Sequence, residues 1–360
     1  MNLRILEGVC RPLFCFEVGF SIDLEAAARV SSGAERLSLQ HREHSGPFEL
    51  RPPPLCITER AEAPVAPFQI GPVVELVLYD FGAASVSYSI PLRESPAELL
   101  ELSNALRGHA GLVADARRRI TRLVESLGTA IERPKIAERI EDYFIFQITK
   151  LEGAPDAAAL CREHAELLAR VLRAETSELS EEEIADAIEA RLSFGKRDVT
   201  LVDWDSALLI GPEPDELRSV LEFANVQLLE LRYLDEDLDR TLERSYQLLF
   251  RRTGWRSLSP ASFSEGARLV STLQVESAVL LERVTNALKF LGEEYLARLY
   301  RLTADRLHLG DWAAALTRKL ATIENIYQTM SSRAAARRME LLEWIIIILI
   351  AVELVLGLRK

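Results

Sequence analysis

The chain has few residues of the types that usually carry out catalysis or bind metals. Its 360 residues include four cysteines and five histidines. The cysteines form no CxxC pair and show no zinc-binding spacing; they are Cys10, Cys15, Cys56 and Cys161. We therefore expect reduced thiols in a cytosolic compartment, with no disulfide framework.

Candidate metal ligands are equally sparse. Cys161 and His164 lie three residues apart on an expected helix, and His41 and His44 lie three apart in an expected loop. A protein metal site needs three or four ligands, and no further ligand-type residues cluster near either pair. We expect no metal ion and no cofactor.

Recognised catalytic motifs are also missing. The sequence contains no P-loop, no GxGxxG, no GxSxG and no HExxH. Asp203 and Asp205 flank Trp204 in an expected hairpin, where the alternation of side chains predicts solvated strand-edge carboxylates rather than an acid–base pair. The sequence thus offers no catalytic residue. Whether the chain is an enzyme stays open, although the missing motifs favour a protein without catalytic activity.

An excess of basic residues is absent too. The net charge of -12 argues against general nucleic-acid binding, which requires a basic surface. A local basic cluster on an expected helix consists of Arg117, Arg118, Arg119 and Arg122. Ion pairing with the acidic residues of the same protein is the preferred interpretation of this cluster. We expect no nucleic-acid partner.

The first 211 residues predict a mixed head. Residues 1–72 are expected to be an irregular segment with one or two strands that belongs to this head. Residues 73–211 are expected to form an α+β domain with two hairpins, at 73–91 and 198–210. Asp23, Ser95 and Ser180 are expected helix N-caps. Strands and helices do not alternate regularly, which predicts an α+β rather than a doubly wound fold.

Residues 214–338 predict a long, coiled-coil-like helical region. Apolar residues recur in steps of four and three over residues 217–242, which is the seam of a helix that packs lengthwise against a partner. A second long helix is expected over residues 273–291 and a third from Leu316 onward. Together these helices predict a long antiparallel hairpin or a three-helix stalk.

Four polar residues of the first long helix are candidates for an interaction or for structural pairing: Asn225, Gln227, Arg232 and Asp235. Asp235 occupies a seam position, where a carboxylate is costly unless it is paired. Arg232 lies three residues earlier on the helix and can reach it. Structural pairing is preferred over catalysis for this group.

The C-terminal residues 341–358, LLEWIIIILIAVELVLGL, predict a transmembrane helix. Eighteen helical residues rise about 27 Å, close to the roughly 30 Å of a hydrocarbon core. The residues expected to mark the span are Leu341, Trp344, Ile345, Ile348, Glu353 and Leu358. The alternative is a helix buried in an oligomer, in which Glu353 could bond across protomers. We expect a chain anchored in the membrane by its C-terminus, with its bulk in the cytoplasm and its orientation undetermined.

Four segments in order resemble one known family. They are VLYDFGAASVSYSIPL, NVQLLELRYLDEDLD, RLHLGDWAAALTRKLATIENIYQTM and LEWIIIILIAVE. Over roughly residues 70–358 the chain is similar to the required-for-meiotic-nuclear-division family, catalogued as domain of unknown function 155. The resemblance implies no catalytic residues. It implies a bacterial member, because eukaryotic relatives are mitochondrial and this sequence shows no transit peptide.

The sequence as a whole leads to one favoured function and two alternatives. The predicted fold is an α+β N-terminal domain followed by the helical stalk and a C-terminal transmembrane helix. The favoured function is a non-catalytic, membrane-tethered scaffold that forms homo-oligomers through its C-terminal helices, with protein partners unknown. The alternatives are an enzyme with an unrecognised site in the head, and a ribosome- or RNA-associated factor that supports translation at the membrane.

Overall fold

The computed structural model describes residues 3–31, 34–36, 52–61, 68–92, 95–153, 156–212, 214–250, 275, 278 and 294–357. His41, His44 and Leu358 lie outside these residues, as does nearly all of the second long helix expected over residues 273–291. The chain divides into two compact units. The head comprises Met1–Tyr233 and Arg283–Gly310, and the helical unit comprises Leu234–Glu282 and Asp311–Lys360.

The head is built around a large mixed sheet. Its strands are β1 (Arg4–Glu17), β2 (Ser21–Ile22), β3 (Ala34–Arg36), β4 (Leu55–Arg60), β5 (Val73–Leu78), β6 (Ala83–Ser87), β7 (Ile90–Pro91), β8 (Ile131–Glu132), β9 (Ile140–Glu152), β10 (Arg191–Leu192), β11 (Val199–Val202) and β12 (Ser206–Ile210). The main sheet has the order β10-β11-β12-β9-β1-β6-β5-β4-β3, and β7 also pairs with β1. Strands β12 and β9 are parallel, and the other pairs are antiparallel. β2 and β8 form a separate two-stranded sheet.

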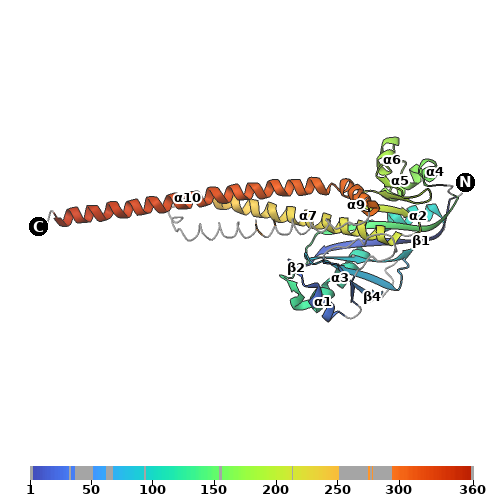
Figure 1. The fold of residues 1–360 in the computed structure, drawn as a ribbon, viewed down its shortest axis with the longest axis horizontal. Helices are drawn as coiled ribbons and strands as arrows, with labels where there is room; N and C mark the ends of the chain where they lie inside the picture. Colours follow the sequence, from blue (N-terminus) through green and yellow to red (C-terminus); the bar gives the residue numbers. More distant parts are fainter. Residues whose placement is uncertain are drawn as a thin grey trace. The chain divides into compact units, whose positions relative to one another are not determined.

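Helices cover both faces of this sheet. They are α1 (Leu24–Val30), α2 (Pro96–Leu106), α3 (Ala110–Leu127), the short 3-10 helix η1 (Gly128–Ala130), α4 (Ala157–Glu163), α5 (Ala165–Arg173), α6 (Glu181–Ala187) and α9 (Glu294–Arg306). Two long helices are α7 (Pro214–Phe250) and α10 (Leu309–Gly357). Figure 1 shows α3 on one side of the strands and the first part of α7 on the other.

The central strand β1 separates two cores by the alternation of its side chains. Phe14 and Phe16 point into the core that includes Ile120 of α3. The odd-numbered residues Cys15 and Glu17 point to the opposite face, the one covered by α7, and are also buried. Residues 1–72 therefore supply the strand on which both cores are built.

Small side chains on β6 allow α7 to lie close to the sheet. Ala83, Ser85 and Ser87 alternate along this strand and are all buried. Cys15 of β1 pairs with Ser85, and Glu17 pairs with Ala83. Because these β6 residues are short, side chains of α7 can reach the neighbouring strands.

Local signals explain several element boundaries. Asp23 accepts hydrogen bonds from the backbone N–H groups of Glu25 and Ala26, and so caps α1. Gly82, between β5 and β6, has a φ of +106°, and a Cβ there would lie 2.0 Å from the carbonyl oxygen of Gly19. The sharp turn of this hairpin therefore requires glycine.

The expectation of solvated carboxylates between β11 and β12 is wrong for Asp203. This side chain is fully buried, and Arg306 of α9 and Arg173 of α5 donate to it at 2.6 and 3.3 Å. The Tyr143 hydroxyl donates to the backbone carbonyl of Asp203 at 2.9 Å. The Asp203 carboxylate can be buried because two guanidinium groups compensate its charge.

Within the helical unit, α7 and α10 lie side by side. Lys319 of α10 forms ion pairs with Asp235 and Asp239 of α7 at 2.7 and 2.6 Å. Leu238, Leu316 and Ile323 are buried. The predicted seam implies one buried face, whereas in the head every α7 residue from 220 to 231 is buried. That stretch is thus a core helix of the head.

The predicted C-terminal transmembrane helix is wrong. No helix in the described part of the chain combines the length and the apolar character needed to cross a membrane. Glu343 and Glu353 bracket the apolar residues 344–352, a run that rises only about 14 Å. The span assigned to Leu341, Trp344, Ile345, Ile348, Glu353 and Leu358 is therefore withdrawn, and with it the predicted anchoring of the chain by its C-terminus.

Replacing Asp203 by asparagine should destabilise the head. The change leaves two partly buried guanidinium groups without their shared, fully buried carboxylate, and breaking a buried pair typically costs about 3 kcal/mol or more. We expect the lower end of this range, because Asp186 still pairs with both arginines. The free energy of unfolding in urea measures the loss. Asp205→Asn is the control: Asp205 pairs with Arg107 but is partly exposed, so its loss should cost less than about 1 kcal/mol. Equal losses in the two variants would contradict the proposed role of Asp203.

Candidate functional site

The most unusual feature of the head is a layer of polar side chains between α7 and the sheet. Arg218, Glu222 and Glu230 share one side of α7, because they lie at steps of four or eight residues. The sheet contributes residues from three strands. We call these seven residues the polar layer: Arg11, Glu17, Glu75, Ser85, Arg218, Glu222 and Glu230.

At one end of the polar layer, charges are well compensated. Arg218 donates to Glu75 at 2.6 Å, and Arg11 donates to the same carboxylate at 3.4 Å and to Gln147 at 3.3 Å. Burial alone would raise the pKa of Glu75, but Arg218 and Arg11 together hold it below its ordinary value. This end is a partly buried ion-pair network.

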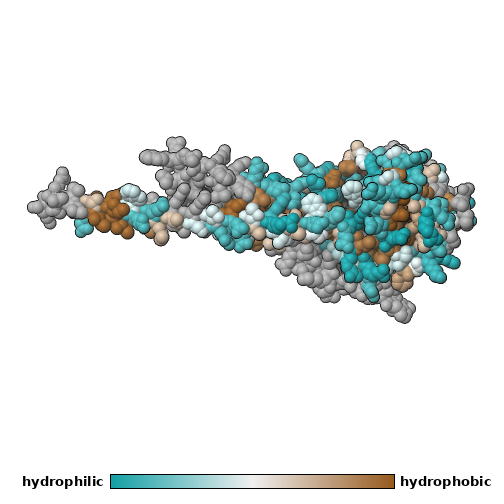
Figure 2. Space-filling model, turned by 90° about the horizontal axis from the view of Figure 1, so that it is seen from above, coloured by the Kyte–Doolittle hydropathy of each residue, from teal (hydrophilic) through white to brown (hydrophobic). Residues whose placement is uncertain are grey.

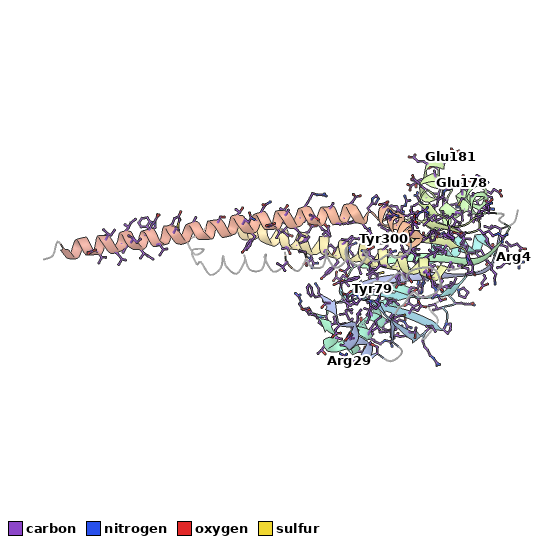
Figure 3. All side chains as sticks on the ribbon, viewed as in Figure 1. Arg4, Arg29, Tyr79, Glu178, Glu181 and Tyr300 are labelled. Atoms are coloured by element: carbon purple, nitrogen blue, oxygen red, sulfur yellow. The ribbon has the colours of Figure 1, made fainter. Side chains whose placement is uncertain are left out.

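In the middle of the layer, the Ser85 hydroxyl forms a short hydrogen bond with Glu222. Burial raises the pKa of Glu222, although Arg218 and Ser85 oppose the shift. Burial, followed by the nearby Glu222 carboxylate, also raises the pKa of Cys15 and Tyr79. Tyr79, labelled in Figure 3, lies with its ring centroid 6.3 Å from that of Phe223 on α7.

At the other end of the layer two carboxyl groups meet. Glu17 is 3% exposed and Glu230 is 0% exposed. Burial raises the pKa of Glu230 to about 7. Burial, and then the adjacent Glu230 charge, raise the pKa of Glu17 well above its ordinary value, while Lys135 partly opposes this. Such a coupled pair retains at least one proton near neutral pH.

The four polar residues singled out on α7 have separate contacts. Asn225 is buried and donates to the Leu221 carbonyl at 2.9 Å, and Gln227 accepts from the Tyr300 hydroxyl at 2.7 Å. Tyr300 is labelled in Figure 3. Arg232 donates to Glu141 at 2.6 Å, within the head, while Asp235 pairs with Lys319 in the helical unit. The structure does not bring these four side chains into one site.

Three of the four arginines in the basic cluster on α3 have contacts within the head. Arg119 is 2% exposed and pairs with Asp115 at 2.8 Å and Glu59 at 2.6 Å. Arg118 also pairs with Asp115, and Arg117 donates to backbone carbonyl groups at 3.2 and 2.8 Å. The cluster therefore gives little support to an RNA-binding surface.

In the described part of the chain, no group of three or more His, Cys, Asp or Glu side chains is arranged so that it could hold a metal ion. Cys161 is buried in α4, and burial raises the pKa of its thiol although Arg191 opposes this. His164 ends α4, where its backbone N–H bonds to the carbonyl of Leu160.

Comparison with known proteins places the chain in a family. A family model described as "Uncharacterized protein MJ0711, N-terminal domain" matches residues 7–216, which is more than half of the chain. The chain belongs to this family. The uncharacterized protein MJ0711 of Methanocaldococcus jannaschii is 22% identical over 223 residues, which cover 61% of this chain and 67% of that protein. No solved structure matches the chain.

Membership of the MJ0711 family corrects the resemblance inferred from the sequence. The match lies over the head, and no finding supports the meiotic-nuclear-division family or domain of unknown function 155. The similar protein is archaeal, which conflicts with the predicted bacterial member. Short motifs in apolar hairpins and helices reflect packing, so they distinguish families poorly.

Sequence reasoning missed Glu17, Glu222 and Glu230. Each lies within an apolar run, Glu17 in LFCFEVGF and the other two in LEFANVQLLEL. A carboxylate in such a run is a signal of burial with a partner or a proton. That signal could have identified the polar layer in outline, without showing which strand faces which side chain.

The polar layer predicts that the head becomes less stable as pH rises from 5 to 8. Glu17, Glu222 and Glu230 have raised pKa values, so the folded state retains protons that the unfolded chain loses above about pH 4.3. The stabilisation therefore declines as pH rises towards about 7, where Glu230 titrates. The lowered pKa of Glu75 changes the stability of the head only below this pH range.

Urea unfolding at pH 5, 6, 7 and 8 measures this effect, which we expect to be on the order of 1–3 kcal/mol. The control is Glu125→Gln, at an exposed position of α3, which should leave the pH dependence unchanged. Stability that rises with pH over this range would contradict the assignment.

Proposed function

We propose that the protein is a non-catalytic interaction protein that self-associates through the end of α10. The observation that supports this is a run of apolar side chains that are all at least half exposed. The large ones are Leu342, Trp344, Ile345, Ile346, Ile347, Ile348, Leu349, Ile350 and Val352, with exposures from 50% to 62%. Figure 2 shows brown, hydrophobic atoms gathered on this part of α10.

The apolar character extends around the whole helix. Residues 344–350 are seven consecutive apolar residues, about two full turns. A helix that is apolar on every side is normally buried, and an exposed patch of this kind on a single chain marks an interaction surface. We call residues 344–352 the apolar segment.

Burial of the apolar segment contributes a large part of the free energy that association requires. Complete burial of one large apolar side chain contributes about 1.5–3 kcal/mol. Covering the exposed half of seven such side chains therefore contributes roughly 5–10 kcal/mol. Association itself costs an estimated 4–15 kcal/mol, so several copies, or further contacts along α10, are needed for a stable assembly.

A second copy of the chain is the partner that this surface fits best. Every copy presents the same apolar segment, and a self-complementary surface produces a closed symmetric assembly. Because the segment is apolar all round, one copy can contact more than one neighbour. Bundles of more than two helices are therefore favoured over a simple pair.

The head gives less support to an enzyme. The acids of the polar layer that have raised pKa values are Glu17, Glu222 and Glu230, which are 3%, 5% and 0% exposed. A catalytic acid must reach its substrate, and these groups are sealed between α7 and the sheet. Their arrangement suits a structural role within the head.

Replacing Ile345 and Ile348 by glutamate should dissociate the assembly. The two charges cannot be buried against another apolar helix without a large penalty. We expect the mass of the full-length protein, measured by light scattering after gel filtration at micromolar concentration, to fall from an oligomer to a monomer. A chain that ends at Arg338 should behave in the same way.

The matched control is the pair Asn325→Glu and Gln328→Glu. These residues are exposed on the same helix at the same spacing, so the double variant adds equal charge outside the apolar segment. It should retain the mass of the unmodified protein. If the unmodified protein is monomeric, or if both double variants behave alike, the proposed self-association is wrong.

A further inference from the structure

We infer that Glu17 and Glu230 form a site for a single proton. The bound proton stabilises the packing of α7 on β1, and loss of the proton weakens this packing. The two residues come from opposite layers of the head. Glu17 is the last residue of β1, and Glu230 lies on α7. They are separated by more than 200 residues of sequence, so their meeting depends on the complete fold.

The site is enclosed and lacks other partners. Both oxygens of Glu230 and Oε2 of Glu17 are buried without a hydrogen-bond partner of ordinary geometry among the described residues. Glu17 faces Ala83 across the strand pair, and this methyl side chain supplies no polar group. Buried carboxyl oxygens normally find donors, so a proton held between the two groups is the simplest compensation.

Cations do not replace this proton. Lys135, an exposed residue after β8, is the cation that acts on Glu17, and no lysine or arginine of the described residues acts on Glu230. Arg232, two residues farther along α7, donates to Glu141. By contrast, Glu222 on the same helix has both Arg218 and Ser85. When both groups ionise, Glu17 and Glu230 are therefore the least compensated charges of the polar layer.

Loss of the proton would place two like charges in a nonpolar enclosure. They would repel each other, and the helix can relieve the repulsion by moving away from β1 or by admitting water. Glu230 lies about one helical turn before Leu234, where the helical unit begins on the same continuous helix. The protonation state thus acts on the last turn of α7 that belongs to the head.

Hydrogen exchange of the full-length protein at pH 6 and pH 8 tests this inference. After correction for the intrinsic effect of pH, amides of α7 around residue 230 should exchange about tenfold faster at pH 8, the change that corresponds to one pKa unit. Glu230→Gln and Glu17→Gln should each bring this ratio close to one, because a neutral amide cannot ionise. Glu125→Gln should keep the ratio of the unmodified protein.

Infrared spectroscopy of the unmodified protein provides a second test that needs no variant. A protonated carboxyl band should be present at pH 6 and weaken by pH 9. Glu230→Gln should have a weaker band at pH 6, with the remainder from Glu17 and Glu222, whose pKa values burial also raises. Equal exchange at the two pH values, or no such band, would overturn the inference. Slower exchange at pH 8 on addition of Mg²⁺ or Ca²⁺ would also overturn it, because the pair would then hold a cation.

Discussion

The head depends on how the charges of α7 are compensated where this helix meets the sheet. Most core helices bury an apolar stripe, yet α7 packs the partly buried Arg218 and the buried Glu222 and Glu230 against strands. Each of them needs a partner, because an uncompensated buried charge costs several kcal/mol. Glu75 and Ser85 provide partners from β5 and β6. The polar contacts therefore specify the position of α7 along the strands more narrowly than apolar contacts alone would.

The polar layer and the apolar segment differ in their exposure to solvent. In the head, the carboxyl groups with raised pKa values are enclosed, and at Asp203 two arginines compensate a buried carboxylate. At the end of α10, large aliphatic side chains remain exposed. This contrast is what supports the proposed interaction protein: the acids with raised pKa values are buried, whereas an apolar surface suited to protein contacts is exposed.

Local sequence patterns predicted the positions of hairpins and helix caps. No sequence pattern predicted contacts between residues that lie far apart in the chain. The hairpin expected at residues 73–91 corresponds to β5 and β6, and the cap at Asp23 is formed, because both depend on neighbouring residues. The periodicity of α7 predicted a helix with one buried face. Residue spacing alone cannot show that a sheet also covers the other faces of that helix. The C-terminal residues 341–358 are long enough to cross a membrane only if Glu343 and Glu353 are counted within the transmembrane helix. Contacts such as Glu17 with Glu230 arise from topology, which no single sequence pattern encodes.

The head is formed from two separate stretches of the sequence, and this affects how it folds during synthesis. Arg306 of α9 completes the enclosure of Asp203, and α9 returns to the head after the helical unit has begun. A chain emerging from the ribosome would therefore complete the sheet before the helix that closes it exists. At roughly 5–20 residues per second, the interval between residues 233 and 310 lasts on the order of 4–15 s. During that time Asp203 lacks one arginine, and the nascent head must persist as an incomplete domain.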